Sequence, residues 1–190
     1  MQLTKRDVVG AAIAILDEYG LGDLTMRRLA TSLNVAAGAL YWHFPNKQAL
    51  LAAVADRILE PVSAPSDGAW DRQLTEIATA VRDALLAHRD AAEIVSAAFA
   101  SRMTTSTVVA LFARCLQAGG IREHDAELAA TSLLYYVLGH TIDEQSRMQM
   151  DSSGALEDSA SPLFESPTAT DRFTFGLSLF IAGARAMIKA

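Results

Sequence analysis

Residues 38–51, GALYWHFPNKQALL, hold several side chains that can bind phosphate within a short stretch. Tyr41 supplies a phenol, His43 an imidazole and Lys47 an ammonium group. Each of these groups can donate a hydrogen bond to a phosphate oxygen, and the lysine adds a positive charge. Their types and close spacing therefore predict contact with a nucleic-acid backbone.

Two short helical segments must position these donors. The first runs from Thr25 to Leu33 with Thr25 as its N-cap, and the second runs from about Ala36 to His43. The LNV sequence between them predicts a tight turn, because Asn34 tolerates the left-handed conformation that ends a helix. Trp42 and Phe44 are expected to pack and to lock the second segment onto the first helix of the chain.

A pair of short helices joined by a tight turn is typical of the DNA-binding helix-turn-helix. Its second helix must enter a major groove about 12 Å wide, and the small residues of the AAGAL sequence would let it do so. The alternative is an ordinary three-helix cluster, since short helix pairs are common. The helix-turn-helix is the favoured interpretation.

The charge distribution limits where DNA could bind. The whole chain has a formal net charge of −6, which argues against a general nucleic-acid surface. Residues 1–50 carry five Lys and Arg against four Asp and Glu, so residues 51–190 hold eleven basic and eighteen acidic residues. Only the first quarter of the chain is therefore expected to face phosphates.

The rest of the sequence predicts an all-α protein in two parts. A linker rich in Pro and Ser at 61–68 separates an N-terminal domain, residues 1–60, from a larger helical domain, residues 69–190. Helices are expected at 4–19, 25–33, 36–43, 47–59, 69–87, 89–100, 105–118, 125–148 and 171–189. Residues 151–170, rich in Ser and acidic residues, are interpreted as a mobile loop.

The last helix is apolar nearly all round. Phe173 and Leu177 lie on one side, and Phe175 and Leu179 lie on the other. Such a helix must be covered on both sides. Because the chain is too short to supply both covers, we expect a homodimer.

Other features exclude several classes of protein. The start of the chain does not have the pattern of a signal peptide, and no apolar run is long enough to span a membrane. The only cysteine, Cys115, is interpreted as a buried thiol, which fits a reduced, cytoplasmic setting. HRD at 88–90 lacks the glycine-rich loop of a kinase, and no nucleophile elbow occurs, so we expect no catalytic residues and no enzyme.

One further cluster could bind a metal. His140, Asp143 and Glu144 are spaced so that they share one face of a helix. A polar stripe at a subunit seam is the favoured interpretation, and we expect no metal and no cofactor.

The sequence TMRRLATSLNVAAGALYWHFPNKQALL resembles the DNA-binding motif of the tetracycline repressor (TetR) family of bacterial transcription regulators. The stretches 84–95, 135–145 and 173–186 are similar to the ligand-binding domain of the tetracycline repressor subgroup. The resemblance implies a homodimer with an N-terminal three-helix head that reads double-stranded operator DNA. It also implies a C-terminal domain that binds a small-molecule effector and dimerises.

The resemblance also implies which residues of the head contact DNA. The expected DNA-binding residues are Thr25, Arg27, Arg28, Ala36, Ala37, Gly38, Tyr41, His43 and Lys47. The second helix offers only small side chains, so we expect few hydrogen bonds from it to DNA bases. Arg27, contacts with thymine methyl groups and DNA shape would carry more of the specificity.

In the resembled subgroup a histidine binds the drug together with magnesium, and Val95 stands at the matching position. A valine cannot bind Mg²⁺, so we expect neither tetracycline nor metal but a small, largely hydrophobic or aromatic effector. The expected pocket is lined by Ile77, Val81, Val95, Phe99, Val109, Phe112 and Tyr135, with Arg102, Met103 and Asp143 at its rim.

Taken together, these patterns predict a homodimeric repressor that leaves a palindromic operator when an effector binds. An activator of the same family remains open. A helical small-molecule-binding protein that has lost DNA binding also remains open, because the recognition helix is slim and the chain is acidic.

Overall fold

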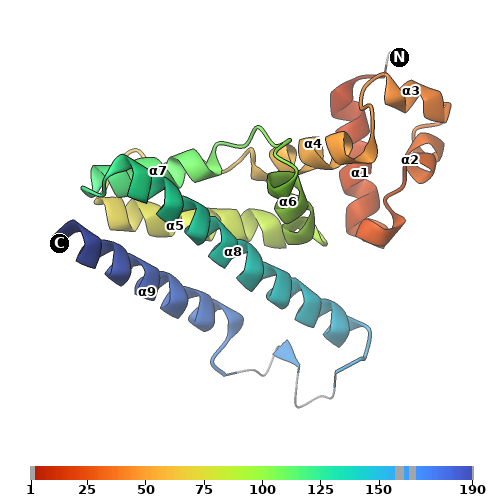
Figure 1. Ribbon diagram of the computed structural model, residues 1–190. Coiled ribbons are helices and arrows are strands. Elements are labelled where there is room, and N and C mark those ends of the chain that lie inside the picture. Colours follow the sequence, from red (N-terminus) through yellow and green to blue (C-terminus); the bar gives the residue numbers. More distant parts are fainter. Residues whose placement is uncertain (1–2, 157–160, 163–165, 190) are drawn as a thin grey trace. The chain divides into compact units, whose positions relative to one another are not determined.

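The computed structural model describes residues 3–156, 161–162 and 166–189, and no strand is assigned within these ranges. Figure 1 shows the arrangement of the helices. The elements are α1 (Lys5–Tyr19), η1 (Leu21–Asp23), α2 (Met26–Ser32), α3 (Ala37–Tyr41), α4 (Lys47–Leu59), α5 (Trp70–Leu86), α6 (Ala91–Ala100), α7 (Val108–Ala118), α8 (Glu123–Ser152) and α9 (Ala169–Lys189). The expected all-α fold with an N-terminal helix-turn-helix is confirmed.

Local sequence signals fix the starts of the early helices. Thr4 and Asp7 form a reciprocal capping box, in which the Thr4 backbone N–H and hydroxyl donate to Asp7 Oδ2 at 2.9 and 2.7 Å. These hydrogen bonds from Thr4 hold the pKa of Asp7 below its usual value. Thr25 and Asn46 cap α2 and α4 through their side-chain oxygens. The helices therefore begin where their capping residues predict.

The chain forms two compact units that are not continuous in sequence. The first unit holds Met1–Pro61 and Ala84–Ser106, and the second holds Val62–Asp83 and Thr107–Ala190. Helix α6 thus belongs with the N-terminal helices, because it packs closely against α4. The helix-turn-helix therefore shares its compact unit with a helix that comes about thirty residues after α4.

In the first unit, Asp56 of α4 ties down the loop that follows α6. One carboxylate oxygen accepts hydrogen bonds from the backbone N–H of Thr105 and Ser106 at 2.9 and 3.1 Å. The side-chain hydroxyls of Thr104 and Thr105 donate to the same carboxylate at 2.5 and 2.6 Å. This arrangement holds the C-terminal end of α6 against α4.

The other end of α6 is fixed to the end of α1. The backbone N–H of Leu21 donates to Asp90 Oδ2 at 2.7 Å, and the Arg89 N–H donates to Asp17 at 3.3 Å. Gly20 has a φ of +85°, and a Cβ there would lie 2.9 Å from Asp90 Oδ2. Glycine is therefore required at this approach for both conformation and space.

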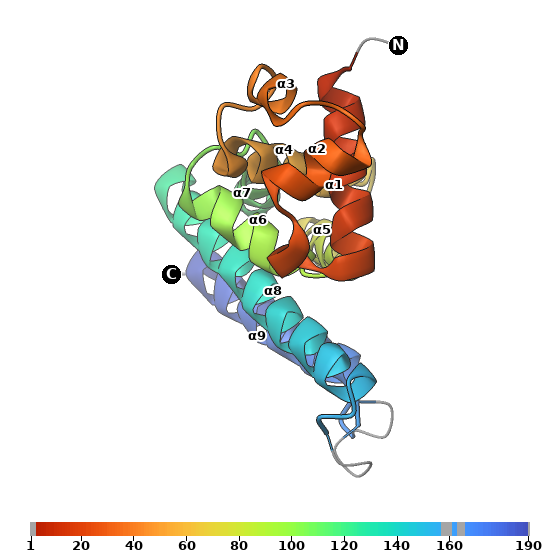
Figure 2. The same cartoon turned by 90° about the vertical axis from the view of Figure 1, so that its right-hand side faces the viewer.

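The second unit is built on α8 and α9, which run side by side (Figures 1 and 2). Helix α7 packs on α8 and contributes Leu111, Phe112 and Leu116 to the interior. Cys115 is also buried, and burial raises the pKa of its thiol, so it is confirmed as a structural residue. None of the helices in the described ranges is long and apolar enough to cross a membrane.

The loop expected at residues 151–170 is shorter in the structure, because helices extend into both of its ends. Helix α8 continues to Ser152, and α9 begins at Ala169. Residues 157–160 and 163–165, within this stretch, lie outside the described residues.

Candidate nucleic-acid interface and effector domain

Helix α3 presents a slim, exposed surface. Ala36, Ala37 and Gly38 are all exposed, and a Cβ at Gly38 would meet no atom within 4 Å. Leu40 and Phe44 lie on the opposite side and are buried. The helix is therefore anchored by one side and free to approach a groove with the other.

Trp42 differs from the expectation. The prediction that it packs beside Phe44 is wrong, because its side chain is 90% exposed. Leu40 and Phe44, four residues apart, are the buried side chains at this end of α3, and Trp42, its C-cap residue, lies between them in sequence. A large aromatic ring therefore adjoins the small residues of α3 on the exposed side. An exposed large aromatic is a signal of a binding surface that sequence patterning alone does not separate from a core residue.

The two arginines of α2 have different surroundings. Arg27 is exposed, and it forms no ion pair with any of the described residues. Arg28 forms an ion pair with Asp23, and its guanidinium carbon lies 3.8 Å from the centroid of the Tyr19 ring. The charge of Arg28 is thus used inside the head, where it joins α2 to η1 and α1. Its expected DNA contact stays a prediction.

The remaining predicted phosphate donors follow the turn after α3. Tyr41 is 50% exposed, whereas His43 and Lys47 are partly exposed. Lys47 is the first residue of α4, just after the Asn46 cap. Thr25 uses its hydroxyl to accept a hydrogen bond from the Arg28 N–H at 3.1 Å, so it positions α2. Tyr41 is therefore exposed, and His43 and Lys47 keep part of their surface open to a ligand.

The predicted effector residues fall in both compact units. Ile77, Val81, Val109 and Phe112 belong to the second unit, and Val95, Phe99, Arg102 and Met103 belong to the first. Ile77, Val81, Val95 and Phe112 are fully buried, Phe99 and Val109 are half-buried, and Arg102, Met103 and Asp143 are exposed. Their grouping into one pocket stays a prediction.

Tyr135 is also exposed, by 65%, and lies on the outer side of α8. Leu128 is two helical turns away on the same side of α8 and is 58% exposed. On α9, Phe175 and Leu179 are 65% and 58% exposed. Packing within the single chain leaves each of these four residues, the outer apolar face, uncovered.

A buried ion pair joins three helices of the second unit, and sequence reasoning missed it. Arg82 of α5 donates to both carboxylate oxygens of Glu144 at 2.9 and 2.6 Å, and also to the Thr170 hydroxyl at 3.1 Å. The side chains of Arg82 and Glu144 are only 7% and 13% exposed. One sequence signal could have found it. Arg82 lies four positions after Ala78 and three before Leu85, so it shares the buried face of α5 with them, where a charged residue needs a partner.

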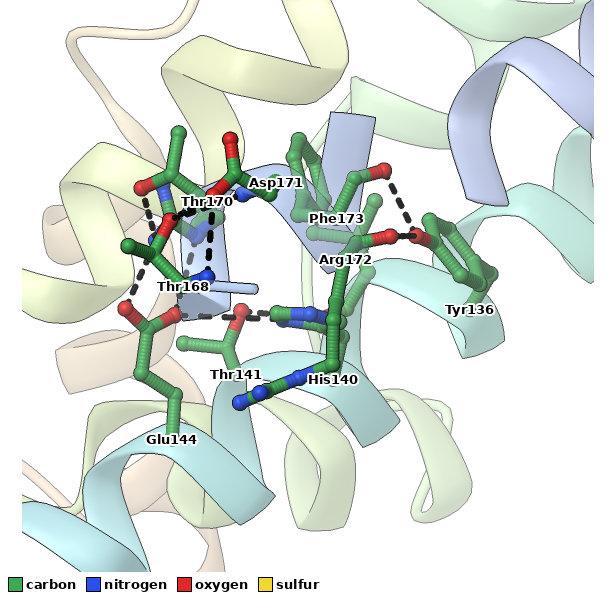
Figure 3. Close-up of polar contacts among 11 residues, drawn as sticks. Tyr136, His140, Thr141, Glu144, Thr168, Thr170, Asp171, Arg172 and Phe173 are labelled. Atoms are coloured by element: carbon green, nitrogen blue, oxygen red, sulfur yellow. Dashed lines mark hydrogen bonds and ion pairs between the residues drawn. The ribbon is translucent and has the colours of Figure 1, made fainter. Parts of the chain in front are cut away.

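Phe173 and His140 lie beside this pair where α8 meets α9, and Tyr136 lies next to Phe173 (Figure 3). The Tyr136 ring stacks on Phe173 at 5.7 Å between centroids, and its hydroxyl donates to the Phe173 carbonyl at 2.7 Å. His140 meets Phe173 edge-on, with its Nδ1 3.8 Å from Glu144 Oε2. His140 and Glu144 are therefore part of the cluster that Arg82 holds together, whereas Asp143 is exposed. No cluster suited to a metal ion occurs among the described residues.

His140 predicts a pH dependence of folding. Burial lowers its pKa, Arg82 and Arg172 also lower it, and Glu144 and Asp143 oppose the shift. The unfolded chain therefore binds a proton more readily than the native state, so stability is full above the unfolded pKa of about 6.5 and is lost as the pH falls through the folded pKa. Replacing His140 with leucine should reduce the loss of stability between about pH 7.5 and about pH 5, measured by urea unfolding.

The control for this prediction is His124→Asn, at an exposed position near the start of the same helix. It should keep the wild-type dependence on pH. An unchanged dependence in His140→Leu would show that the acid sensitivity comes from other groups.

Two family descriptions match most of the chain. The one described as "Bacterial regulatory proteins, tetR family" matches residues 8–54, which include α2, α3 and the turn between them. The one described as "Tetracyclin repressor-like, C-terminal domain" matches residues 61–188.

Individual proteins are similar over nearly their full length. The tetracycline repressor protein class E of Escherichia coli is 32% identical over 98% of this chain and 93% of its own. The crystal structure of Mycobacterium smegmatis BioQ is 47% identical, with a TM-score of 0.86 over 97% of this chain and 99% of its own. A structure of BioQ with its double-stranded DNA operator is 46% identical, with a TM-score of 0.81 over the same shares.

A third relative was solved with a small molecule. A variant of TetR from Acinetobacter baumannii AYE, in complex with minocycline, is 32% identical, with a TM-score of 0.80 over 100% of both chains.

Proposed function

The chain belongs to the tetR family of bacterial regulatory proteins, and on that basis we propose that it is a ligand-responsive repressor that binds operator DNA as a homodimer. It acts as a regulator rather than an enzyme, and it works in the cytoplasm, where bacterial DNA lies.

The observation that carries the proposal is the exposed face of α3. Ala36, Ala37 and Gly38 leave the helix slim, Trp42 is almost fully exposed, and Lys47 follows at the start of α4. A short helix of this kind, flanked by phosphate donors, suits a major groove. The similarity to BioQ, solved with its DNA operator, supports the same use of the head here.

Recognition of DNA by this head relies on few base-reading side chains. Small residues can contact thymine methyl groups but cannot form the bidentate hydrogen bonds that distinguish bases. Arg27, Tyr41 and the exposed Trp42 are the larger groups on the same part of the head. Because Tyr41 is expected to bind phosphate, we expect specificity to come from Arg27, Trp42, contacts with thymine methyl groups and DNA shape.

The proposed effector is a small, mostly apolar or aromatic molecule. Ile77, Val81 and Phe112, which we expect to contact the effector, are buried apolar residues of the second unit. The Acinetobacter relative binds minocycline, which supports a small-molecule effector for this chain. Val95, however, offers no ligand atom to a metal, so we expect an effector that does not need one.

The proposed dimer forms through the outer apolar face. Leu128 and Tyr135 on α8 and Phe175 and Leu179 on α9 are exposed in the single chain. Two copies that meet through this face would form a four-helix arrangement in which each copy covers the other. A two-fold dimer also matches a palindromic operator, which presents two equivalent half-sites.

The experiment that tests the proposal is a mobility shift on DNA that flanks the gene for this chain, with competitor DNA and at two salt concentrations. Specific, salt-sensitive binding that is released by apolar aromatic compounds is the expected result. A reporter gene behind the bound site would separate repression from activation. If selection from random DNA sequences also yields no bound site, the chain is a small-molecule-binding protein without DNA binding.

Lys47 provides a sharper prediction for the head. Replacing it with alanine should weaken binding to specific and non-specific DNA alike and lower the salt slope by about one unit for each subunit. The physical reason is that a phosphate contact releases a counterion but reads no base. Arg114→Ala, which removes an exposed charge on α7, is the matched control and should leave the slope unchanged. Full salt dependence in Lys47→Ala would mean that Lys47 does not contact phosphate.

A further inference from the structure

A groove lies between α1 and α4 in the first unit, within the DNA-reading part of the chain. Its volume is about 1190 Å³, and residues at the start of α1, along α4 and between α3 and α4 line it. This volume is above the roughly 300–1,000 Å³ that is usual for small-molecule sites. Of the residues predicted to bind DNA or the effector, only His43 and Met103 line this groove, so most of its lining belongs to neither predicted site.

The groove exists because small residues face each other across it. Gly10 lines it from α1, and Ala49, Ala52 and Ala53 line it from α4. A Cβ at Gly10 would meet no atom within 4 Å, so no neighbouring side chain fills the space. Larger apolar groups, among them Val9 and Phe44, complete the lining. The groove can therefore take an apolar body.

The acidic residues that line the groove all have hydrogen-bond or ion-pair partners. Asp7 accepts hydrogen bonds from Thr4, both carboxylate oxygens of Asp56 are bound by the loop after α6, and Glu60 pairs with Arg57. These three acids are thus already partnered. Glu60 is neutralised by Arg57, whereas Asp7 and Asp56 keep their charge and accept hydrogen bonds from neutral donors.

The two basic residues at the start of α1 are not neutralised in this way. Lys5 and Arg6 both line the groove, and neither forms an ion pair with a carboxylate among the described residues. The Lys5 ammonium lies 5.7 Å from the centroid of the Phe44 ring, which is itself part of the lining. The charge of Lys5 therefore lies close to the apolar lining at Phe44, just before the start of α4.

From this juxtaposition we propose that the groove binds an amphipathic monocarboxylate. The carboxylate pairs with Lys5 and Arg6 near Phe44, and the apolar body lies along α4 beside Gly10. The α4 residues that line the groove run from Ala49 to Glu60, about 17 Å at a rise of about 1.5 Å per residue, and the apolar ones, Ala49, Ala52 and Ala53, lie at the end near Phe44. A linear or flat organic acid fits this length, whereas a neutral apolar molecule would leave both cations without a partner.

The experiment titrates the full-length protein with decanoate and with 1-decanol by calorimetry. Gly10→Leu fills the groove from a helical position with no neighbour to displace, and replacing Gly also favours the helix. Lys5→Gln combined with Arg6→Gln removes the charge but leaves the groove open. Ala14→Leu, at an exposed position of α1 outside the groove, is the control.

We expect decanoate to bind the wild type and Ala14→Leu equally, and to bind Gly10→Leu at least about tenfold more weakly because the lining is filled. The Lys5 and Arg6 double variant should lose a similar factor for decanoate but not for 1-decanol. Circular dichroism shows that each variant is folded. Equal decanoate affinity in the wild type and a folded Gly10→Leu would overturn the proposal, since the ligand would then bind elsewhere, as would absence of binding to the wild type.

Discussion

Replacing Arg82 with alanine is expected to lower the free energy of unfolding by about 3–5 kcal/mol, because it leaves the Glu144 carboxylate buried without its partner. Glu144 is 13% exposed, and both of its oxygens accept hydrogen bonds from the guanidinium. The same guanidinium also donates to Thr170 and lies 5.2 Å from the Phe173 ring centroid. The substitution therefore removes the link between α5, α8 and α9 in one step.

Denaturant unfolding at a fixed protein concentration measures this loss, since the stability of a dimer depends on concentration. Arg72→Ala is the matched control on the same helix, because Arg72 pairs with Glu76 in an exposed ion pair. That pair is 73% and 40% exposed, and its loss should cost only about 0.3–0.5 kcal/mol. A loss of that small size in Arg82→Ala would show that the buried pair is solvated in solution.

Two further variants separate charge from geometry. Arg82→Lys keeps the charge, but a single ammonium cannot reproduce the two parallel hydrogen bonds, so its stability should be intermediate. Arg82→Met together with Glu144→Leu removes both charges and should recover most of the lost stability. If the double variant is as unstable as Arg82→Ala, the cost comes from lost packing rather than from the unpaired carboxylate.

The elements of the head could be predicted because their signals are local. The expected range of residues 47–59 is the range of α4, and Thr4, Thr25 and Asn46 each cap the helix they precede. Each of these signals acts within about one turn of helix. The sequence pattern predicts that α6 starts at Arg89, and the helix begins at Ala91 because Asp90 has a φ of +54°.

The contacts that assemble the units could not be predicted in the same way. Asp56 binds Thr104 and Thr105, which lie 48 and 49 residues further along the chain, and Arg82 binds Glu144 across 62 residues. Nothing in the spacing of a single sequence identifies such partners. The exposure of Trp42 was missed for a related reason. Whether an aromatic side chain is buried depends on which distant residues pack around it, and the local sequence does not identify those residues.

The long-range contacts give the head a consequence for regulation. Asp56 of α4 holds the C-terminal end of α6. At the N-terminal end, Asp17 and Asp90 join α6 to α1 and η1. The two ends of α6 are therefore fixed to different helices of the head. Under the proposed function, an effector that shifts α6 would move it together with the DNA-reading helices. A rigid connection of this kind suits a two-state switch better than an independent loop would.

The prediction with the largest functional effect concerns the outer apolar face. Replacing Leu179 with aspartate should convert the protein to a monomer, because it would place a charge within a surface of exposed apolar side chains on α8 and α9. Sedimentation velocity measures the change of mass directly. Circular dichroism should stay helical, since Leu179 is 58% exposed and supports little of the packing within the chain.

Loss of the dimer should weaken operator binding far more than loss of any single phosphate contact. Two linked heads bind two half-sites with an avidity that can exceed that of one head by about 10²–10⁴-fold, and a monomer forfeits that factor. Thr174→Asp is the control, because it adds the same charge at an exposed position of α9 about 140° around the helix from Leu179. It should remain dimeric and bind the operator as the wild type does. If Leu179→Asp is still a dimer, the outer apolar face is not the subunit contact. If it is a monomer with full operator affinity, one head is sufficient for binding, and the proposal that two half-sites are read together is wrong.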